Sequence, residues 1–256
     1  MDLLHDVVLI KVGFVLIIVT VALVAGLPAL RRPAEGDHVE GYARGEALAV
    51  GVFLGAGIIH MLGDAASDFD EAGVAYPVGE LLCGTVVLLL LWLEHLGNKL
   101  AGASGTSEGS VLAILAAIIL ALHSFLVGAA LGTASELTTT VVVFLAVLAH
   151  KWAAAFALGL TLSRSRLGKR TTTALFLIFA LMFPVGAAVG AGALAVTASH
   201  PLFEPTFASL AAGTFIYLGT LHGLTSSTLI AKCQHFPQFA MVATGFVLMA
   251  VVAIWT

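Results

Sequence analysis

Residues 111–132 read VLAILAAIILALHSFLVGAALG and carry no charged side chain. A helix needs about 20 consecutive apolar residues to cross a bilayer, so this stretch predicts a membrane-spanning helix. Gly128 and Gly132 give it a face of small residues that lets another helix approach closely. His123 and Ser124 lie near its middle, where polar side chains usually face a bundle interior or a polar pathway. The stretch therefore predicts a membrane protein with polar chemistry at membrane depth.

Similar apolar stretches lie on both sides of this one. The predicted spans are residues 7–30, 42–66, 78–95, 111–132, 141–163, 172–197, 207–231 and 239–255. Their apolar runs are continuous and do not alternate, which favours helices over a closed barrel. The composition agrees, because 10% of the residues are charged, whereas a soluble domain carries about 25%. We predict an all-α polytopic membrane protein whose single transmembrane domain covers residues 1–256.

The positive charges predict the orientation of the chain. Most of the 11 lysines and arginines lie in or beside alternate connections: Arg31, Arg32, Arg44, Lys99, Arg164, Arg166, Lys169, Arg170 and Lys232. The intervening connections, 67–77, 133–140 and 198–206, contain none. By the positive-inside rule both termini are extracytoplasmic, and a plasma or cytoplasmic membrane is the expected location. The net charge of −4 leaves no basic surface for a nucleic acid.

An internal repeat is visible in two of the spans. Residues 51–60, GVFLGAGIIH, align without gaps on residues 213–222, GTFIYLGTLH, with identical residues at four of ten positions. The two segments would cross the membrane in opposite directions. Repeats of inverted topology are typical of transporters that work by alternating access.

His123 and His150 are the main candidate metal ligands. Each lies about ten residues from the outer end of its span, and the two spans are consecutive and antiparallel. Two imidazoles at one depth could bind a divalent metal such as zinc. Alternatively, each histidine forms a hydrogen bond with a backbone carbonyl or a serine. Ser124 is likewise either an oxygen ligand or bonded to its own helix.

Other ionisable residues lie along the predicted spans. His60 and Asp64 are one helical turn apart near the outer end of span 42–66, as entry ligands or as a hydrogen-bonded pair. His222 is deep in span 207–231, and Lys151 is too far from either end of its span to reach an interface easily. Lys151 would therefore place a charge along the pathway.

Several motifs appear in a characteristic order. They are GVFLGAGIIHMLGDA at 51–65, YP at 76–77 with LEH at 93–95, HSFLVGAALG at 123–132, HK at 150–151 with Phe156 and Leu158-Gly159, AAGTFIY at 211–217, and AIW at 253–255. Together they resemble the ZIP (Zrt-, Irt-like protein) family of divalent metal transporters, in its HS…G and HK branch, over nearly the whole chain.

The resemblance implies eight helices in a 3+2+3 arrangement, with inverted repeats around spans 111–132 and 141–163. It implies transport of zinc, with iron or manganese as alternatives, towards the cytoplasm. The metal is then the substrate, and neither a cofactor nor enzymatic activity is expected. His123 and His150 match the family's ligand histidines, and Ser124 matches an adjacent site position. Lys151 matches the branch in which lysine replaces part of a second metal site.

The chain departs from the family pattern where carboxylates are expected. Val127 stands in place of a glutamate. Ala154, four residues after His150, stands where many members of the family have another glutamate, and Phe183, before Pro184, stands where some members have a further carboxylate. A non-transporting ZIP-like scaffold or regulator is therefore the alternative. An intramembrane zinc hydrolase would need a base near the metal, and no deep carboxylate is available. The expected partners are the metal ion and the lipid bilayer, with a homodimer left open.

Overall fold

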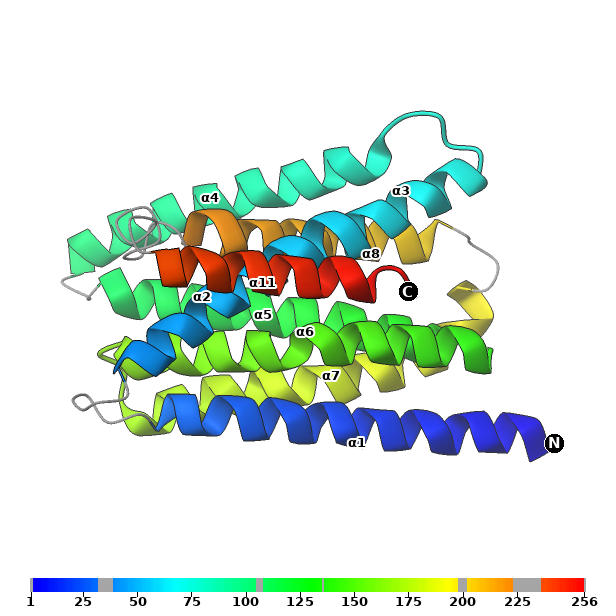
Figure 1. The fold of residues 1–256 in the computed structure, drawn as a ribbon, viewed down its shortest axis with the longest axis horizontal. Coiled ribbons are helices and arrows are strands. Elements are labelled where there is room, and N and C mark those ends of the chain that lie inside the picture. Colours follow the sequence, from blue (N-terminus) through cyan, green and yellow to red (C-terminus); the bar gives the residue numbers. More distant parts are fainter. Residues whose placement is uncertain are drawn as a thin grey trace.

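The computed structural model describes residues 2–31, 39–104, 108–134, 136–197, 202–222 and 236–255. Every regular element in these ranges is a helix, which confirms the all-α prediction (Figure 1). The elements are α1 (Asp2–Leu30), α2 (Val39–Gly55), η1 (Ala56–Met61), α3 (Leu62–Glu71), α4 (Val78–Ser104), α5 (Glu108–Thr133), α6 (Leu137–Arg164), α7 (Lys169–Thr197), α8 (Phe203–Tyr217), η2 (Leu218–His222) and α11 (Phe236–Val252).

Most helices run beyond the predicted apolar spans. The helix α4 continues to Ser104 although its apolar run ends near His95, because a helix does not have to stop where it leaves the apolar layer. The described part of the seventh span ends at His222, and its predicted continuation to residue 231 lies outside the described residues. Within the described ranges, six helical stretches are long and apolar enough to cross a membrane: Val8–Leu30, Tyr42–Glu71, Val78–Lys99, Gly109–Thr133, Leu137–Arg164 and Lys169–Ala193.

Successive passes of the chain run antiparallel (Figure 1). The two ends of the chain point to the same end of the bundle, which also holds the connection 72–77, and we call it the terminal end. The opposite end, called here the far end, holds the connection 165–168 between α6 and α7. The basic residues counted in the sequence lie towards this far end wherever the structure describes them.

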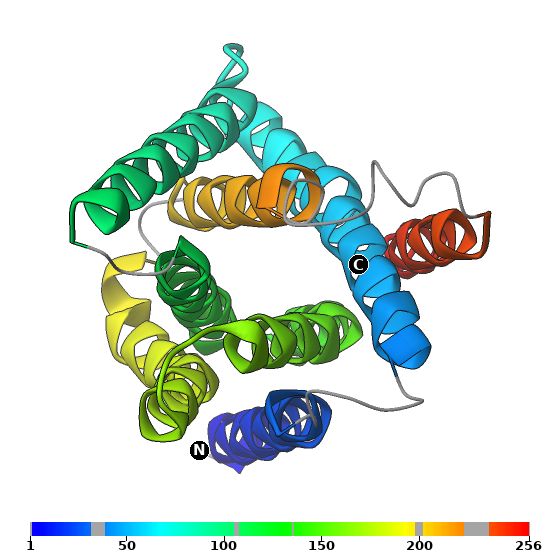
Figure 2. The ribbon, with the colours of Figure 1, turned by 90° about the vertical axis from the view of Figure 1, so that its left-hand side faces the viewer.

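The helices form two groups that meet along the centre of the bundle. In one group α1 packs on α6 and α7 packs on α5; in the other α2 packs on α11 and α4 packs on α8. Viewed from the far end, α5 and α6 lie between the outer helices of the two groups (Figure 2). The groups meet mainly where α2 contacts α6 and where α5 contacts α8.

The packing of α5 on α7 depends on small residues. A Cβ atom at Gly128 would lie 3.1 Å from the backbone nitrogen of Ala187, and one at Gly132 would lie 2.7 Å from that of Ala191. Both distances are too short for a side chain, so the two backbones meet directly. The close approach predicted from this glycine pair is confirmed.

The two segments aligned in the sequence share an uncommon local structure. The π-helical turn η1 begins at Ala56, and η2 begins at Leu218, which is the position aligned with Ala56. The helices α2, η1 and α3 are continuous, as are α8 and η2. π-Helical turns occur frequently at functional sites. Their matching positions give the aligned segments a common structural feature as well as common residues.

Candidate functional site

The structure brings His123 of α5 and His150 of α6 together in the middle of the bundle. Their ring centroids are 5.8 Å apart, and the rings are nearly perpendicular, at 75°. Each side chain is 2% exposed. Both helices pack against each other as consecutive antiparallel elements, which is the arrangement that the matched depths of the two residues predict.

The hydrogen bonds of His123 leave one ring nitrogen available. Its Nδ1 lies 3.1 Å from the hydroxyl oxygen of Thr214, and that hydroxyl donates to the carbonyl of Ala211 at 2.6 Å. Nδ1 therefore donates its proton to Thr214, and Nε2 keeps a free lone pair. Within the described structure, His123 Nε2 and His150 Nδ1 are buried without a hydrogen-bond partner. Buried polar atoms are rarely left unpaired, and an unpaired imidazole nitrogen suits a metal ion.

Ser124 and Lys151 face a different helix. The ammonium of Lys151 donates to the hydroxyl of Ser124, which in turn donates to the carbonyl of Phe179 at 3.1 Å. The ammonium also lies 4.4 Å from the centroid of the Phe179 ring and 5.2 Å from that of Phe183. Aromatic faces stabilise a cation at such distances. The pair predicted as a ligand and a pathway charge thus joins α5 and α6 to α7.

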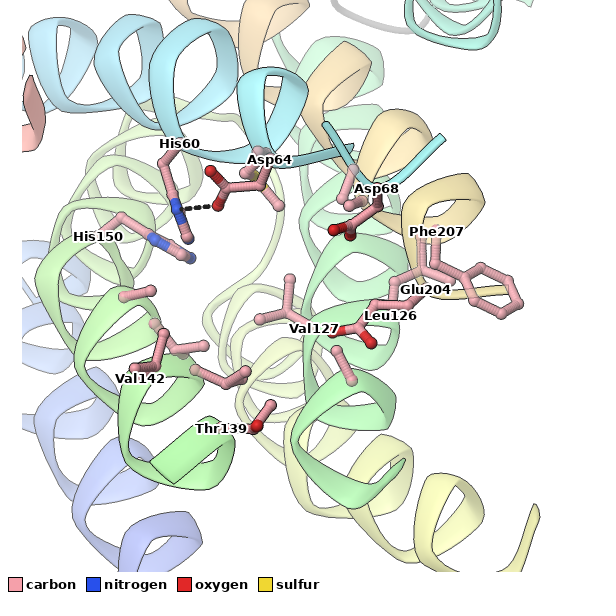
Figure 3. Close-up of a pocket in the computed structure, with 17 residues that line it drawn as sticks. His60, Asp64, Asp68, Leu126, Val127, Thr139, Val142, His150, Glu204 and Phe207 are labelled. Atoms are coloured by element: carbon pink, nitrogen blue, oxygen red, sulfur yellow. Dashed lines mark ion pairs between the residues drawn. The ribbon is translucent and has the colours of Figure 1, made fainter. Parts of the chain in front are cut away.

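A cavity of about 240 Å³ leads from the terminal end towards the histidine pair (Figure 3). It lies between α3, α5, α6 and α8, and His60 and His150 line its inner part. Asp68 lies near the end of α3, and Glu204 is the second residue of α8, so both lie towards the terminal end. Val127, the position where the family pattern has a glutamate, also lines the cavity, whereas Ala154 and Ser124 do not.

His60 and Asp64 form a pair within this cavity. His60 Nδ1 lies 2.7 Å from a carboxylate oxygen of Asp64, across one helical turn. The two sequence interpretations are therefore compatible, since the residues contact each other and also face the cavity. The predicted candidate His222 lies at the end of η2, and its side chain is outside the part of the chain that the structure describes in full.

Carboxylates make the entrance of the cavity negative. Asp64, Asp68 and Glu204 all line it. Burial raises the pKa of the Glu204 carboxyl, which precedes the predicted span 207–231, and the nearby Asp68 raises it further. Asp68 and Glu204 fall in the predicted connections 67–77 and 198–206 and were not among the predicted site residues. The spacing His60, Asp64, Asp68 puts these side chains on one helix face, and this signal could have identified Asp68.

Aromatic rings close the inner end of the cavity. The ring of Phe215 stacks on His123 with centroids 3.8 Å apart, and it lies 5.1 Å from the His150 ring. Phe215 also contacts Phe53, at 4.9 Å. Beyond this contact, Phe53 lines a second cavity of about 40 Å³ that reaches Glu46 in α2. The rings therefore lie between a larger outer cavity, of about 240 Å³, and a smaller inner one, of about 40 Å³.

The donors are arranged along a path and do not form a closed cage. Among the described residues, no three histidine, cysteine, aspartate or glutamate side chains converge as a metal centre. A structural zinc site holds its ion with four ligands. Carboxylates at an entrance, followed by paired imidazoles, instead suit an ion that binds transiently and then moves on. The fold and site thus define a polytopic membrane protein that admits cations into its interior.

Comparison with known proteins agrees with this class. Residues 101–253 match the family described as ZIP zinc transporter. Zinc transporter ZIP2 of Mus musculus is 28% identical over 307 aligned positions, covering 96% of this chain and 98% of the relative. Zinc transporter ZIP2 of Homo sapiens is 29% identical, covering 81% and 84%. Zinc transporter ZIP1 of Homo sapiens is 26% identical, covering 94% and 89%.

The chain belongs to the ZIP zinc transporter family. It is an integral membrane protein that transports divalent metal, and family membership makes it a transporter and not an enzyme. Membership of the ZIP family, which the motifs predicted, is therefore confirmed.

Proposed function

We propose that this chain carries zinc towards the cytoplasm through the cavity, with His150 and His123 as the central ligands. The two unpaired, buried imidazole nitrogens beyond an acid-lined cavity are the observation that carries this proposal. Neutral imidazole is a preferred ligand of zinc. The relatives named as zinc transporters support the choice of metal. Zinc is the substrate in this proposal, and no cofactor takes part.

The proposed transporter has eight spans in a 3+2+3 arrangement. The continuous stretch of α8 and η2 serves as the seventh span, and α11 serves as the eighth. The paired packing supports an inverted repeat, since α1 contacts α6 as α7 contacts α5, and α2 contacts α11 as α8 contacts α4. The matching π-helical turns support the same relation. The central helices α5 and α6 carry the two histidines.

Retention of the cavity argues against a scaffold that has lost transport. That alternative rests on the missing glutamate at Val127. A protein without transport has no need for buried, unpaired imidazoles, because their desolvation is costly. Uptake of zinc into proteoliposomes tests the choice. We expect saturable uptake above that of empty liposomes, and uptake equal to that of empty liposomes would favour the scaffold.

The proposed orientation places the far end in the cytoplasm and the termini outside. A cysteine in place of Glu136, at the terminal end, and one in place of Arg166, at the far end, should react from opposite sides of the membrane. We expect a membrane-impermeant thiol reagent to modify only Glu136→Cys in intact cells. Permeabilised cells provide the control, because both cysteines should then react. Reaction of both in intact cells would contradict the orientation.

The carboxylates Asp68 and Glu204 are expected to concentrate cations at the entrance. The double variant Asp68→Asn with Glu204→Gln should raise the KM for zinc uptake roughly threefold to tenfold and leave kcat nearly unchanged, because the lost attraction acts before the ion reaches the histidines. The difference should shrink at high ionic strength. Uptake is measured in proteoliposomes at low and high salt.

The control for the entrance is Glu71→Gln. Glu71 ends the same helix α3 as Asp68 and is exposed, but it does not line the cavity. Its KM should stay close to that of the parent chain. An equal rise in KM for this control and for the double variant would show that general surface charge causes the effect.

A further inference from the structure

The far half of α2 is fitted closely to α6. The ring of Tyr42 stacks on that of Phe156, with centroids 6.2 Å apart and an interplanar angle of 13°. A Cβ atom at Gly45 would lie 2.7 Å from the same Phe156 ring, so a side chain there would push α2 away. Glycine at this position lets α2 and the Phe156 ring touch without displacing either one.

An ion pair also joins α2 and α6, at the far end of this contact. Arg164, the last residue of α6, donates from Nη1 to Glu46 Oε1 at 2.7 Å and from Nη2 to Glu46 Oε2 at 3.0 Å. Two parallel bonds of this kind are stronger and more specific in direction than a single contact. Tyr42, Gly45 and Glu46 are spaced by three and four residues, so they share one face of α2.

This contact lies beside the second cavity. Glu46 lines the second cavity, of about 40 Å³, together with Phe53 and Thr161. The outer cavity is about 240 Å³. The contact of α2 with α6 is also one of the places where the two groups of helices meet. The larger cavity therefore lies on the outer side, while α2 and α6 are held together beside the smaller one on the inner side.

We propose that the Arg164–Glu46 pair is the latch of the inner gate, which must separate before the ion leaves. The latch rests on the proposed function, since it assumes that the two cavities belong to one path. While the pair is formed, Arg164 neutralises Glu46 and holds α2 on Phe156. When α2 and α6 part, Glu46 is released and offers the departing dication an oxygen ligand at the exit.

Two cysteine reporters test the latch. In a background with Cys83→Ser and Cys233→Ser, Thr139→Cys reports on the outer cavity and Thr161→Cys on the inner one. Each is combined with Glu46→Gln or Arg164→Gln, and the rate of thiol modification is measured in proteoliposomes without zinc. An exposed ion pair contributes up to about 1 kcal/mol, about a fivefold change in an equilibrium. We therefore expect modification of Thr161→Cys to become severalfold faster and that of Thr139→Cys slower.

The controls separate the ion pair from charge alone. The exchange Glu46→Arg with Arg164→Glu should restore the parent rates, and Arg166→Gln, in the loop that follows α6, should not change them. The latch would be overturned if Glu46→Gln and Arg164→Gln both left the rates of thiol modification at the parent values. It would also be overturned if the exchange variant reacted like the single variants. Size-exclusion profiles identify any variant that fails to fold.

A cleavable cross-link gives a second test, in which a covalent link takes the place of the ion pair. Glu46→Cys with Arg164→Cys, joined by a short bifunctional thiol reagent, should stop zinc uptake until the link is cleaved. Continued uptake in the linked protein would overturn the latch. A separate experiment tests the path by measuring whether zinc slows the thiol modification of Thr139→Cys. If zinc does not protect this cysteine but the latch variants still change its reaction, the proposed path fails and the contact remains a conformational latch.

Discussion

Replacing His150 by alanine is expected to remove most zinc uptake, and His123→Ala should have the same effect. Each substitution deletes one of the two buried ring nitrogens proposed to hold the ion. Loss of even a supporting partner of a metal ligand reduces affinity or activity by about tenfold or more, so loss of the ligand should cost at least as much. Initial rates of zinc uptake in proteoliposomes, normalised to the amount of inserted protein, measure the effect.

His95→Ala is the matched control for these variants. His95 lies on α4 with an exposed side chain and does not line the cavity, so its replacement should leave uptake close to that of the parent chain. Thr214→Val should have an intermediate effect, because it removes the hydroxyl that holds His123 Nδ1. Near-parent uptake by both well-inserted histidine variants would show that the two histidines are structural.

The second large effect is expected from restoring a carboxylate at Val127. This side chain lines the cavity one helical turn from His123. A glutamate there would add a negative charge beside the proposed ligands, so Val127→Glu should tighten zinc binding by at least about tenfold, or about 1.4 kcal/mol. Isothermal titration of the purified protein measures the affinity. Turnover is expected to fall, because a more tightly held ion leaves more slowly.

Two further variants make the Val127 result specific. Val127→Gln has nearly the same shape without the charge and should not reproduce the gain. Ala154→Glu lies beyond His150 on α6, and the cavity-lining residues of α6 end at His150, so we expect Val127→Glu to supply most of the gain. If the zinc affinity of folded Val127→Glu is unchanged, the binding site lies elsewhere in the cavity, towards His60 and Asp64.

The sequence alone determined that the chain is all helical and forms a membrane protein. A bilayer requires each span to be apolar over its own length and to satisfy its own backbone, so residues 111–132 identify a span without knowledge of any neighbour. A close approach of some other helix at Gly128 and Gly132 was predicted for a similar reason, because only small residues allow it, but only the structure identified that helix as α7. Helix ends were less accurate, as α4 shows, since helices continue into water.

The direction of individual side chains needed the tertiary structure, although part of it could have been foreseen. Adjacent residues on a helix point about 100° apart. His123 and Ser124 therefore face different neighbours, as do His150 and Lys151. From the sequence all four were candidates for one path, with hydrogen bonding as the alternative for the histidines and Ser124, while the structure turns Ser124 and Lys151 towards Phe179 of α7.

Contacts between distant segments were decided only by the packing of the helices. Asp68 and Glu204 meet at one entrance because α3 packs on α8, and Phe215 covers His123 because α8 packs on α5. Glu46 and Arg164 are 118 residues apart in the chain. Hydropathy is the same for every rotation of an apolar helix about its axis, so it cannot select these partners. The fit of side chains between helices selects one rotation, and that rotation sets the lining of the cavity and the Glu46–Arg164 contact.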